Sequence, residues 1–106
     1  MPRRAKVADL SDYDDAKALR QQAGKYLKEI RRRSGLTQSA LAEKVGARVK
    51  SHISNVERGR SRLESHDYER WAAALSVDRR EFAKTMCQYY DPHYYAALFP
   101  DDADSA

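Results

Sequence analysis

Cysteine and long apolar segments are scarce in this sequence, and their scarcity excludes several classes of protein. Cys87 is the only cysteine among 106 residues, so the chain cannot form a disulfide within itself and suits a reducing cytoplasm. No apolar run approaches the roughly 18 residues that a membrane-spanning helix needs. The basic start, with Arg3, Arg4 and Lys6, leads into polar residues instead of the apolar core of a signal peptide. We therefore expect a soluble cytoplasmic protein.

The usual marks of an enzyme or a metal site are also missing. Cys87 stands beside Met86 with no histidine close to it in the sequence, so a buried thiol is a better interpretation than a nucleophile. No glycine-rich loop for binding phosphate occurs. His52, His66 and His93 lack the spacing of metal ligands. We expect no catalytic residue, no metal and no other cofactor.

Strand patterns are equally absent, because no useful stretch alternates apolar and polar residues. Apolar residues instead recur at steps of three and four, as in amphipathic helices. The longest such pattern predicts a helix from Ser11 to Arg33, with the apolar stripe Ala16, Leu19, Ala23, Tyr26, Leu27 and Ile30. Gly24 disfavours this helix by about 1 kcal/mol relative to alanine. The helix therefore either kinks there or continues unbroken to Arg33.

Shorter helices are predicted towards the C-terminus. One begins at Ser65 or His66, and Asp78 caps the next. A last one covers residues 93–99, before Pro100. The apolar stripes are Tyr68, Trp71, Ala72 and Leu75 in the first and Phe82, Met86 and Tyr89 in the second. The acidic residues 101–106 are expected to form a disordered tail, and the whole pattern predicts an all-α fold of five to six helices.

Positive charge is concentrated in the middle of the chain. The net charge of +4 is by itself a weak indication of a nucleic-acid partner. Residues 20–62, however, hold twelve Lys and Arg against three Asp and Glu, a net of +9. Residues 63–106 hold four against nine, a net of −5, and residues 1–19 hold four of each sign. A polyanion such as DNA is therefore expected to bind the middle segment.

Within that basic segment, residues 37–58 have the pattern of two short helices joined by a turn. Thr37 can cap the first helix, and Gly46 can adopt the left-handed backbone that ends it. The apolar positions are Leu41, Ala42 and Val45 in the first helix and Ile53 and Val56 in the second. This arrangement predicts a helix-turn-helix, whose second helix reads the major groove of double-stranded DNA.

The second helix carries polar side chains on the face opposite its apolar pair. Asn55 is the first candidate for base reading, because its carboxamide can make two hydrogen bonds to adenine. The further base-reading candidates are Ser54, His52, Ser51 and Lys50. Arginines that flank this helix are candidates for phosphate contacts, namely Arg48, Arg58, Arg60 and Arg62. Plain solvated surface is the alternative for these residues.

The order and spacing of these segments resemble the Cro/CI-type helix-turn-helix family, also called the XRE family, of bacterial and phage regulators. The resemblance runs from Gly24 to Phe82 and is carried by residues 30–38, 41–46, 53–59 and 71–78. It implies a lambda-repressor-like DNA-binding domain in a bacterial or phage-encoded protein that associates with the nucleoid.

The same resemblance implies roles for three further residues. Gln38 is expected to bind a DNA phosphate and to brace the reading helix. Arg31 and Glu57 are expected to form an ion pair between the first and third helices.

One spacing departs from the family pattern. Gly46 and Ile53 are seven steps apart, one more than is common in the family. Either an extra residue lies in the turn, at residues 47–49, or the reading helix begins later than usual. Ser51 is a better cap than Val49, which favours the later start.

The segment before the acidic tail is rich in large side chains. These are Tyr89, Tyr90, Tyr94, Tyr95, Leu98 and Phe99, more than a short terminal helix can bury alone. Two alternatives follow. These side chains pack back on Ala16, Leu19 and Ala23 of the first helix, or residues 92–100 form the interface of a two-fold dimer.

The sequence thus predicts a flexible basic arm at residues 1–10, a DNA-binding domain at residues 11–91 and an aromatic segment at residues 92–100. We expect a sequence-specific transcriptional repressor that binds a palindromic operator as a homodimer. The alternative is an antitoxin that binds DNA with the same domain and a protein toxin with the aromatic segment. No membrane partner is expected.

Overall fold

The computed structural model describes residues 10–47 and 50–105, and for residues 10–14, 50 and 103–105 it describes the backbone alone. Within these ranges the chain forms seven α-helices and one 3-10 helix, with no strand. The all-α prediction is therefore confirmed, although five to six helices were expected. The additional helix is the last one, at the acidic end of the chain.

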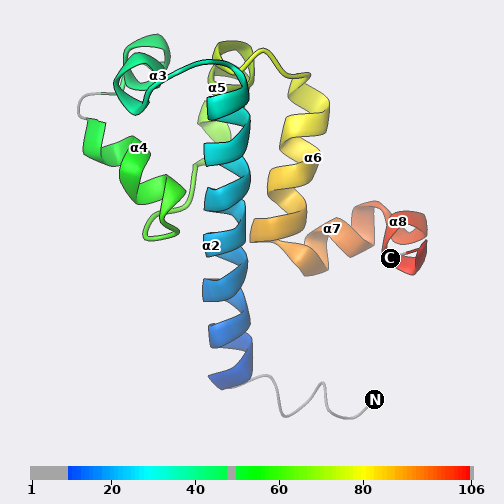
Figure 1. The fold of residues 1–106 in the computed structure, drawn as a ribbon. Coiled ribbons are helices and arrows are strands. Elements are labelled where there is room, and N and C mark those ends of the chain that lie inside the picture. Colours follow the sequence, from blue (N-terminus) through cyan, green and yellow to red (C-terminus); the bar gives the residue numbers. More distant parts are fainter. Residues whose placement is uncertain (1–9, 48–49, 106) are drawn as a thin grey trace.

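The long helix α2 (Leu10–Arg33) is the axis of the molecule (Figure 1). Helices α3 (Gln38–Val45) and α4 (Lys50–Glu57) lie on one side of it, and α6 (Arg79–Tyr90) lies on the other. The 3-10 helix Ser65–Asp67 leads into α5 (Tyr68–Ala74), which contacts both α3 and α6 near the end of α2. Helices α7 (Pro92–Leu98) and α8 (Pro100–Ser105) extend from the far end of α6, away from α3 and α4.

Helix α2 is unbroken at Gly24, so the second of the two alternatives for this helix is confirmed. It begins at Leu10, one residue before the predicted start at Ser11, and its last turn carries basic residues that favour the negative end of a helix. Residues 1–9, most of the predicted basic arm, lie outside the described residues.

The core joins α2 to the helices on both of its sides. The largest fully buried side chains are Trp71, Phe82, Leu27, Leu41, Ile53, Leu63, Leu75, Met86 and Val56. All of the predicted apolar positions of the helix-turn-helix are buried. Since each of α2 to α6 contributes to this core, burial of apolar surface fixes α3 and α4 on the rest of the protein.

Two glycines allow α4 to pack directly on α2. A Cβ atom at Gly24 would lie 2.6 Å from the carbonyl carbon of Glu57 and 2.8 Å from the carbonyl oxygen of Val56. Gly59, which follows α4 with a φ of +78°, lies against Gln21, whose Cα would be 2.8 Å from an added Cβ. The backbones of α2 and of the end of α4 are therefore closer than any side chain at these positions would permit.

The prediction that residues 101–106 form a disordered tail is wrong, because α8 covers all but the last of them. Pro100 suits the first turn of a helix, and the acidic residues after it suit the positive end of the helix dipole. The carboxylate of Asp102 accepts a hydrogen bond from the Tyr95 hydroxyl (3.0 Å) and pairs with Lys84 of α6 (2.8 Å). Composition indicated a solvated tail, whereas these partners are provided by other helices.

Candidate nucleic-acid interface

The first helix of the predicted helix-turn-helix has the expected ends. The Thr37 side chain accepts a hydrogen bond from the backbone N–H of Ala40 (3.0 Å), so it is the N-cap of α3. Gly46 ends the helix with a φ of 73°, in the left-handed region, and the N–H of Ala47 then donates to the carbonyl of Ala42 (2.9 Å). These contacts turn the chain towards α4. Arg48 lies outside the described residues.

The start of the second helix differs from the sequence prediction. Helix α4 begins at Lys50, so Ser51 lies inside the helix and is not its cap. A capping preference is worth about 1 kcal/mol. That is too little to set the first residue of a helix that is anchored by the burial of Ile53 and Val56.

Helix α4 has one buried and one outward face. Ile53, Val56 and Glu57 are buried against the protein. At 100° per residue, Ser51 and Asn55 point away from that face. Ser51 is exposed and Asn55 is half-buried. The two therefore lie on a polar surface that a DNA groove can reach.

Two other base-reading candidates lie on the flanks of α4. Ser54 and His52 are both half-buried, and the ring of His52 stands edge-on to the buried ring of Trp71, with centroids 6.5 Å apart and planes at 88°. His52 is thus held by the core more than Ser51 is. For Lys50 the structure gives only the backbone position, at the first residue of α4.

A buried ion pair holds the end of α4 in place. The Nε of Arg31 lies 2.6 Å from Oε2 of Glu57, and the two side chains are 8% and 3% exposed. A second nitrogen of Arg31 donates to Oε1 of Glu57 (3.1 Å), and a third donates to the carbonyl of Leu36 (2.8 Å). The predicted ion pair is confirmed. All three guanidinium nitrogens of Arg31 and both carboxylate oxygens of Glu57 make hydrogen bonds, which offset the loss of water around a buried pair.

Gln38 joins the same network from the start of α3. Its amide donates a hydrogen bond to Oε1 of Glu57 (2.9 Å). Gln38 therefore braces α4, as predicted. Its contact with a DNA phosphate remains a prediction.

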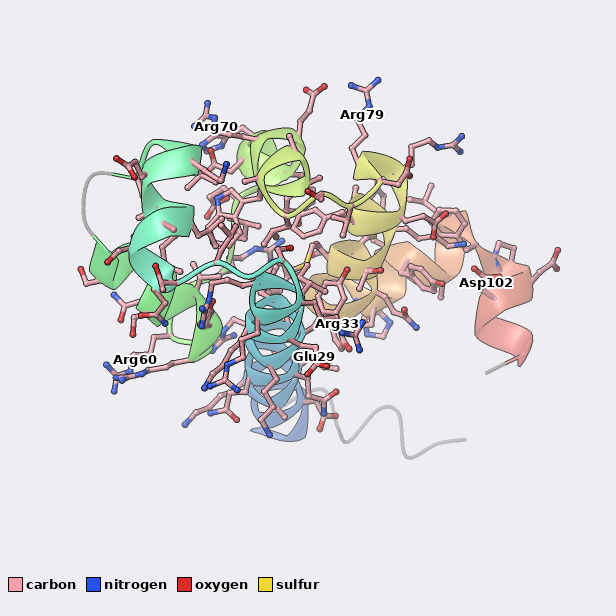
Figure 2. All side chains as sticks on the ribbon, turned by 45° about the horizontal axis from the view of Figure 1, so that its top comes forward. Glu29, Arg33, Arg60, Arg70, Arg79 and Asp102 are labelled. Carbon is pink, nitrogen blue, oxygen red and sulfur yellow. The ribbon has the colours of Figure 1, made fainter. Side chains whose placement is uncertain are left out.

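The flanking arginines fall into two groups. Arg58 and Arg60 are exposed and make no ion pair in the part of the chain that the structure describes; Figure 2 shows Arg60 projecting from the loop after α4. Arg62 instead donates to the carboxylate of Asp91 (3.0 Å), and its guanidinium lies 4.7 Å from the centre of the Tyr90 ring. It ties the loop after α4 to the junction of α6 and α7, a contact over 29 residues that no local pattern indicates.

The C-terminal aromatic residues are divided between the protein interior and its surface. Tyr89 packs on Tyr26 of α2, with ring centres 6.1 Å apart, and the hydroxyl of Tyr90 accepts from the N–H of Leu63 (2.9 Å). Tyr95 is 8% exposed and packs on Phe99 at 5.1 Å. Tyr94 and Leu98 are the exceptions, at 63% and 52% exposed.

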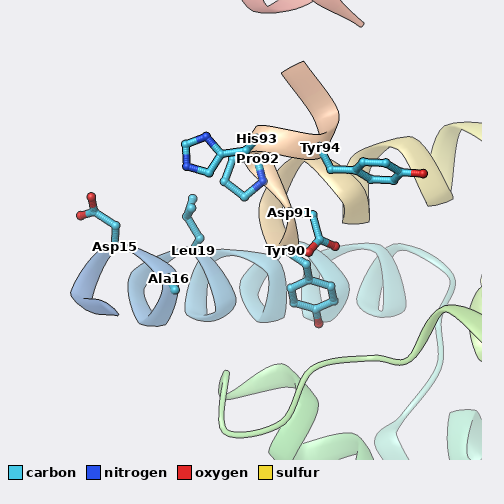
Figure 3. A pocket seen from close by; sticks show the side chains of 8 residues that line it. All are labelled: Asp15, Ala16, Leu19, Tyr90, Asp91, Pro92, His93 and Tyr94. Carbon is cyan, nitrogen blue, oxygen red and sulfur yellow. The ribbon is translucent and has the colours of Figure 1, made fainter. Parts of the chain in front are cut away.

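Packing back on the first helix, one of the two alternatives for this segment, is incomplete. Ala23 is buried and Leu19 half-buried, but Ala16 is exposed. A cleft of about 550 Å³ separates α2 from the α6–α7 junction. Figure 3 shows its lining, formed by Asp15, Ala16, Leu19, Tyr90, Asp91, Pro92, His93 and Tyr94.

The surroundings of Cys87, the grouping of possible metal ligands and the apolar length of the helices bear on enzyme, metal-binding and membrane functions. Cys87 is half-buried, and burial, with the nearby Asp91 carboxylate, raises the pKa of its thiol, the opposite of what activates a cysteine nucleophile. Among the described residues, no group of three or more His, Cys, Asp and Glu side chains could hold a metal ion. None of the helices in those ranges is both long enough and apolar enough to cross a membrane.

Sequence reasoning missed one contact beside the interface. The Nε of Arg20, in the N-terminal half of α2, donates to the carbonyl of Gly59 just after α4 (3.4 Å). Gly24 and Gly59 were the only local signals of this helix crossing. Their role in packing is visible only once the helices are placed.

Comparison with known proteins identifies the family. A family model described as a helix-turn-helix domain matches residues 22–84, from the middle of α2 to the middle of α6. No curated protein matches the chain. The matched residues make up more than half of the chain and include the braced pair α3 and α4. The chain belongs to this Cro/CI-like family of helix-turn-helix domains.

Proposed function

We propose that this protein is a sequence-specific DNA-binding regulator that represses transcription as a homodimer on a palindromic operator. The observation that carries the proposal is the packing of α4, whose inner face is held by burial of Ile53 and Val56 and by the buried Arg31–Glu57 pair. Its outer face remains polar. A rigid helix with a polar outer face is what direct readout in the major groove requires.

In this proposal Asn55 reads a base at the centre of the interface, because it points directly away from the buried face. Ser51 lies one turn before it and contacts the adjacent position. His52 and Ser54, on the flanks, and Lys50, at the start of the helix, reach bases or phosphates at the edges of the groove.

Phosphate contacts hold α4 in register on the duplex. Arg58 and Arg60 carry charge without a carboxylate partner among the described residues, which suits them to bind phosphate. Gln38 does so at the start of α3, where backbone N–H groups point outward. Arg48 and Arg62 complete the proposed set, Arg62 by exchanging Asp91 for a phosphate.

The dimer interface is proposed at α7. Tyr94 and Leu98 are four residues apart, so they share one face of the helix, and both are exposed. On the same helix Tyr95 packs on the ring of Phe99, and Tyr89 and Tyr90 precede it at the end of α6. In a two-fold dimer each chain would present its α4 to one half-site of a palindromic operator, and occupation of a promoter would block polymerase.

The base-reading assignment is tested by comparing Asn55→Ala with Arg60→Ala. A preferred duplex is first selected from a random pool, and affinity is measured on it and on a scrambled duplex. Asn55→Ala is expected to cost about 1–3 kcal/mol on the preferred duplex only. Arg60→Ala should weaken both duplexes alike and reduce the salt dependence. If both variants lose the same affinity on both duplexes, Asn55 does not read a base.

The dimer is tested by light scattering with Leu98→Glu as the variant. The wild-type protein is expected to have the mass of two chains at micromolar concentration, and the variant the mass of one. A wild-type mass of one chain, with and without the operator, contradicts the dimer.

A second candidate is an antitoxin, favoured by the exposure of Tyr94 and Leu98 and by the net charge of −5 over residues 63–106. The same face would then bind a basic toxin. Co-expression with the product of a neighbouring gene distinguishes the two: an antitoxin restores growth, and Leu98→Glu abolishes the rescue while DNA binding persists.

A further inference from the structure

Basic side chains of this protein fall into two groups according to their partners. Paired with a carboxylate are Arg31 with Glu57, Arg33 with Glu29, Arg62 with Asp91, Arg70 with Asp67, Arg79 with Glu69 and Lys84 with Asp102. Without an ion pair in the described ranges are Lys17, Arg20, Lys25, Lys28, Arg32, Arg58 and Arg60. Lys44 and Arg80 also lack one, but they lie apart, on α3 and α6.

Apart from Lys25, the unpaired cations of α2 and of the end of α4 form one surface where these two helices cross. Gly59 packs on Gln21, and Arg58 and Arg60 flank Gly59 in the chain. On α2, Lys17 lies one turn before Gln21 and Lys28 two turns after it, so they belong to the same stripe of the helix.

Two other α2 cations border that stripe, since Arg32 follows Lys28 by one turn and Arg20 contacts the Gly59 carbonyl. Lys25 instead lines a shallow pocket with Tyr26 and Glu29, on the side towards α6. The name α2 ridge is used below for Lys17, Arg20, Lys28 and Arg32. All but Arg20, which is half-buried, are exposed.

The carboxylates of α2 whose side chains are described lie on another side of the helix. Asp15 lines the cleft towards α7 (Figure 3). Glu29 pairs with Arg33 and lines a shallow pocket with Tyr26 and Tyr89, towards α6. Figure 2 shows Arg60 on the α4 side of α2 and Glu29 and Arg33 on the other side. Helix α2 therefore has a cationic side next to α4 and a side of mixed charge facing α6 and α7.

Such a stripe disfavours the isolated helix, because like charges one turn apart, such as Lys28 and Arg32, repel each other. A polyanion that follows the helix removes this repulsion. From Lys17 to Lys28, α2 rises about 16 Å, which equals the axial span of roughly five phosphates on one DNA strand.

We propose that the α2 ridge binds phosphates of the DNA that flanks the half-site under α4. The inference rests on the proposed function, which places DNA against α4, and extends the contact beyond the helix-turn-helix. Lys17 and Arg20 precede residue 22, where the family match begins. The longer α2 thereby enlarges the footprint of the domain on the duplex.

The test compares the wild-type protein with Lys17→Gln, Lys28→Gln and the double variant. Glutamine removes the charge with little change in helix propensity, and circular dichroism verifies the fold. Arg80→Gln is the matched control, since Arg80 is an exposed cation of α6 that makes no ion pair with the described side chains. Affinity is measured over a fourfold range of salt on two selected duplexes. One ends at the half-sites, and the other extends them by about one helical turn on each side.

On the extended duplex, the slope of log K against log salt is expected to become less steep by about 0.9 for each lost phosphate contact. For the double variant, the ratio of wild-type to variant affinity should then shrink about tenfold across the salt range. Arg80→Gln should keep the wild-type slope, and the short duplex should give all proteins similar slopes.

Failure of this inference is distinguishable from failure of the proposed function. Equal slopes for wild type and double variant on the extended duplex overturn the ridge as a DNA contact, even where the wild type binds its selected sequence specifically. A second outcome is a wild type that shows no sequence preference while the double variant still has a less steep salt slope. That result overturns the proposed regulator and supports the ridge. Absence of binding to any duplex overturns both.

Discussion

Replacement of Gly24 by alanine is expected to destabilise this protein, although alanine is the better helix former. Propensity alone predicts a gain of about 1 kcal/mol in the middle of α2. In the folded protein, however, the new Cβ would lie 2.6 Å from the carbonyl carbon of Glu57 and 2.8 Å from the carbonyl oxygen of Val56. These are backbone atoms, so no change of rotamer relieves the overlap.

The size of the effect follows from what has to move. Helix α4 must shift away from α2, and the buried contact of Glu57 with Arg31 stretches with it. Overpacking of a dense core costs typically about 1–3 kcal/mol. The upper end applies here because the neighbour is backbone, and the gain in propensity offsets part of it. We expect the free energy of unfolding to fall by about 2 kcal/mol.

Urea unfolding followed by far-UV circular dichroism measures this change. With an m-value of about 1–3 kcal/mol/M, the midpoint should fall by about 1 M. Ala18→Gly is the control, because Ala18 is exposed on the same helix and its replacement should cost only the propensity difference of about 1 kcal/mol. A Gly24→Ala protein as stable as wild type, or more stable, would refute the close crossing of α2 and α4.

Three further predictions concern the ion pairs and the half-buried phenol of Tyr68. Glu57→Leu leaves Arg31 buried without its counter-charge and should lower the free energy of unfolding by about 3–5 kcal/mol. Adding Arg31→Met should restore part of this loss. A double variant no more stable than Glu57→Leu contradicts the pairing. The hydrogen bond from Lys84 lowers the pKa of Asp102. The contact should therefore be present above the ordinary carboxyl pKa and be lost as pH falls through the lowered pKa of Asp102. At neutral pH, Asp102→Asn should accelerate hydrogen exchange in α8. Burial raises the pKa of Tyr68 to about 12, so the tyrosinate absorbance that Tyr68→Phe removes should titrate with a midpoint near pH 12. The stability that the neutral phenol contributes is complete below the unfolded-state pKa of 10.0 and declines as pH rises through the folded-state pKa.

Local patterns predicted most of the helices because their causes are local. Thr37 and Asp78 cap helices by bonds to N–H groups three residues later, and the left-handed Gly46 ends α3 through contacts within a few residues. The apolar spacing likewise identified the buried face of α4. Recognition of the family pattern added the Arg31–Glu57 pair, which spacing alone does not predict.

The incorrect predictions concern features that depend on contacts between residues far apart in the sequence. Residues 101–106 were expected to be disordered from their composition, but Asp102 contacts Lys84 and Tyr95 on other helices. Ser51 was favoured as a cap by its residue type, but the start of α4 depends on how the helix packs. The ion pair of Arg62 with Asp91 is likewise a long-range contact that no local pattern indicates, whereas the phosphate contact of Arg62 stays a prediction.

The sequence by itself determined the helical class, the buried and polar faces of the helix-turn-helix and the concentration of positive charge in residues 20–62. Tertiary structure alone decided that α2 and α4 meet at Gly24 and Gly59, and which cations are neutralised by carboxylates. The reason is one of range. Helix faces and caps depend on neighbours within about four residues, whereas an ion pair depends on which distant carboxylate the fold brings within reach.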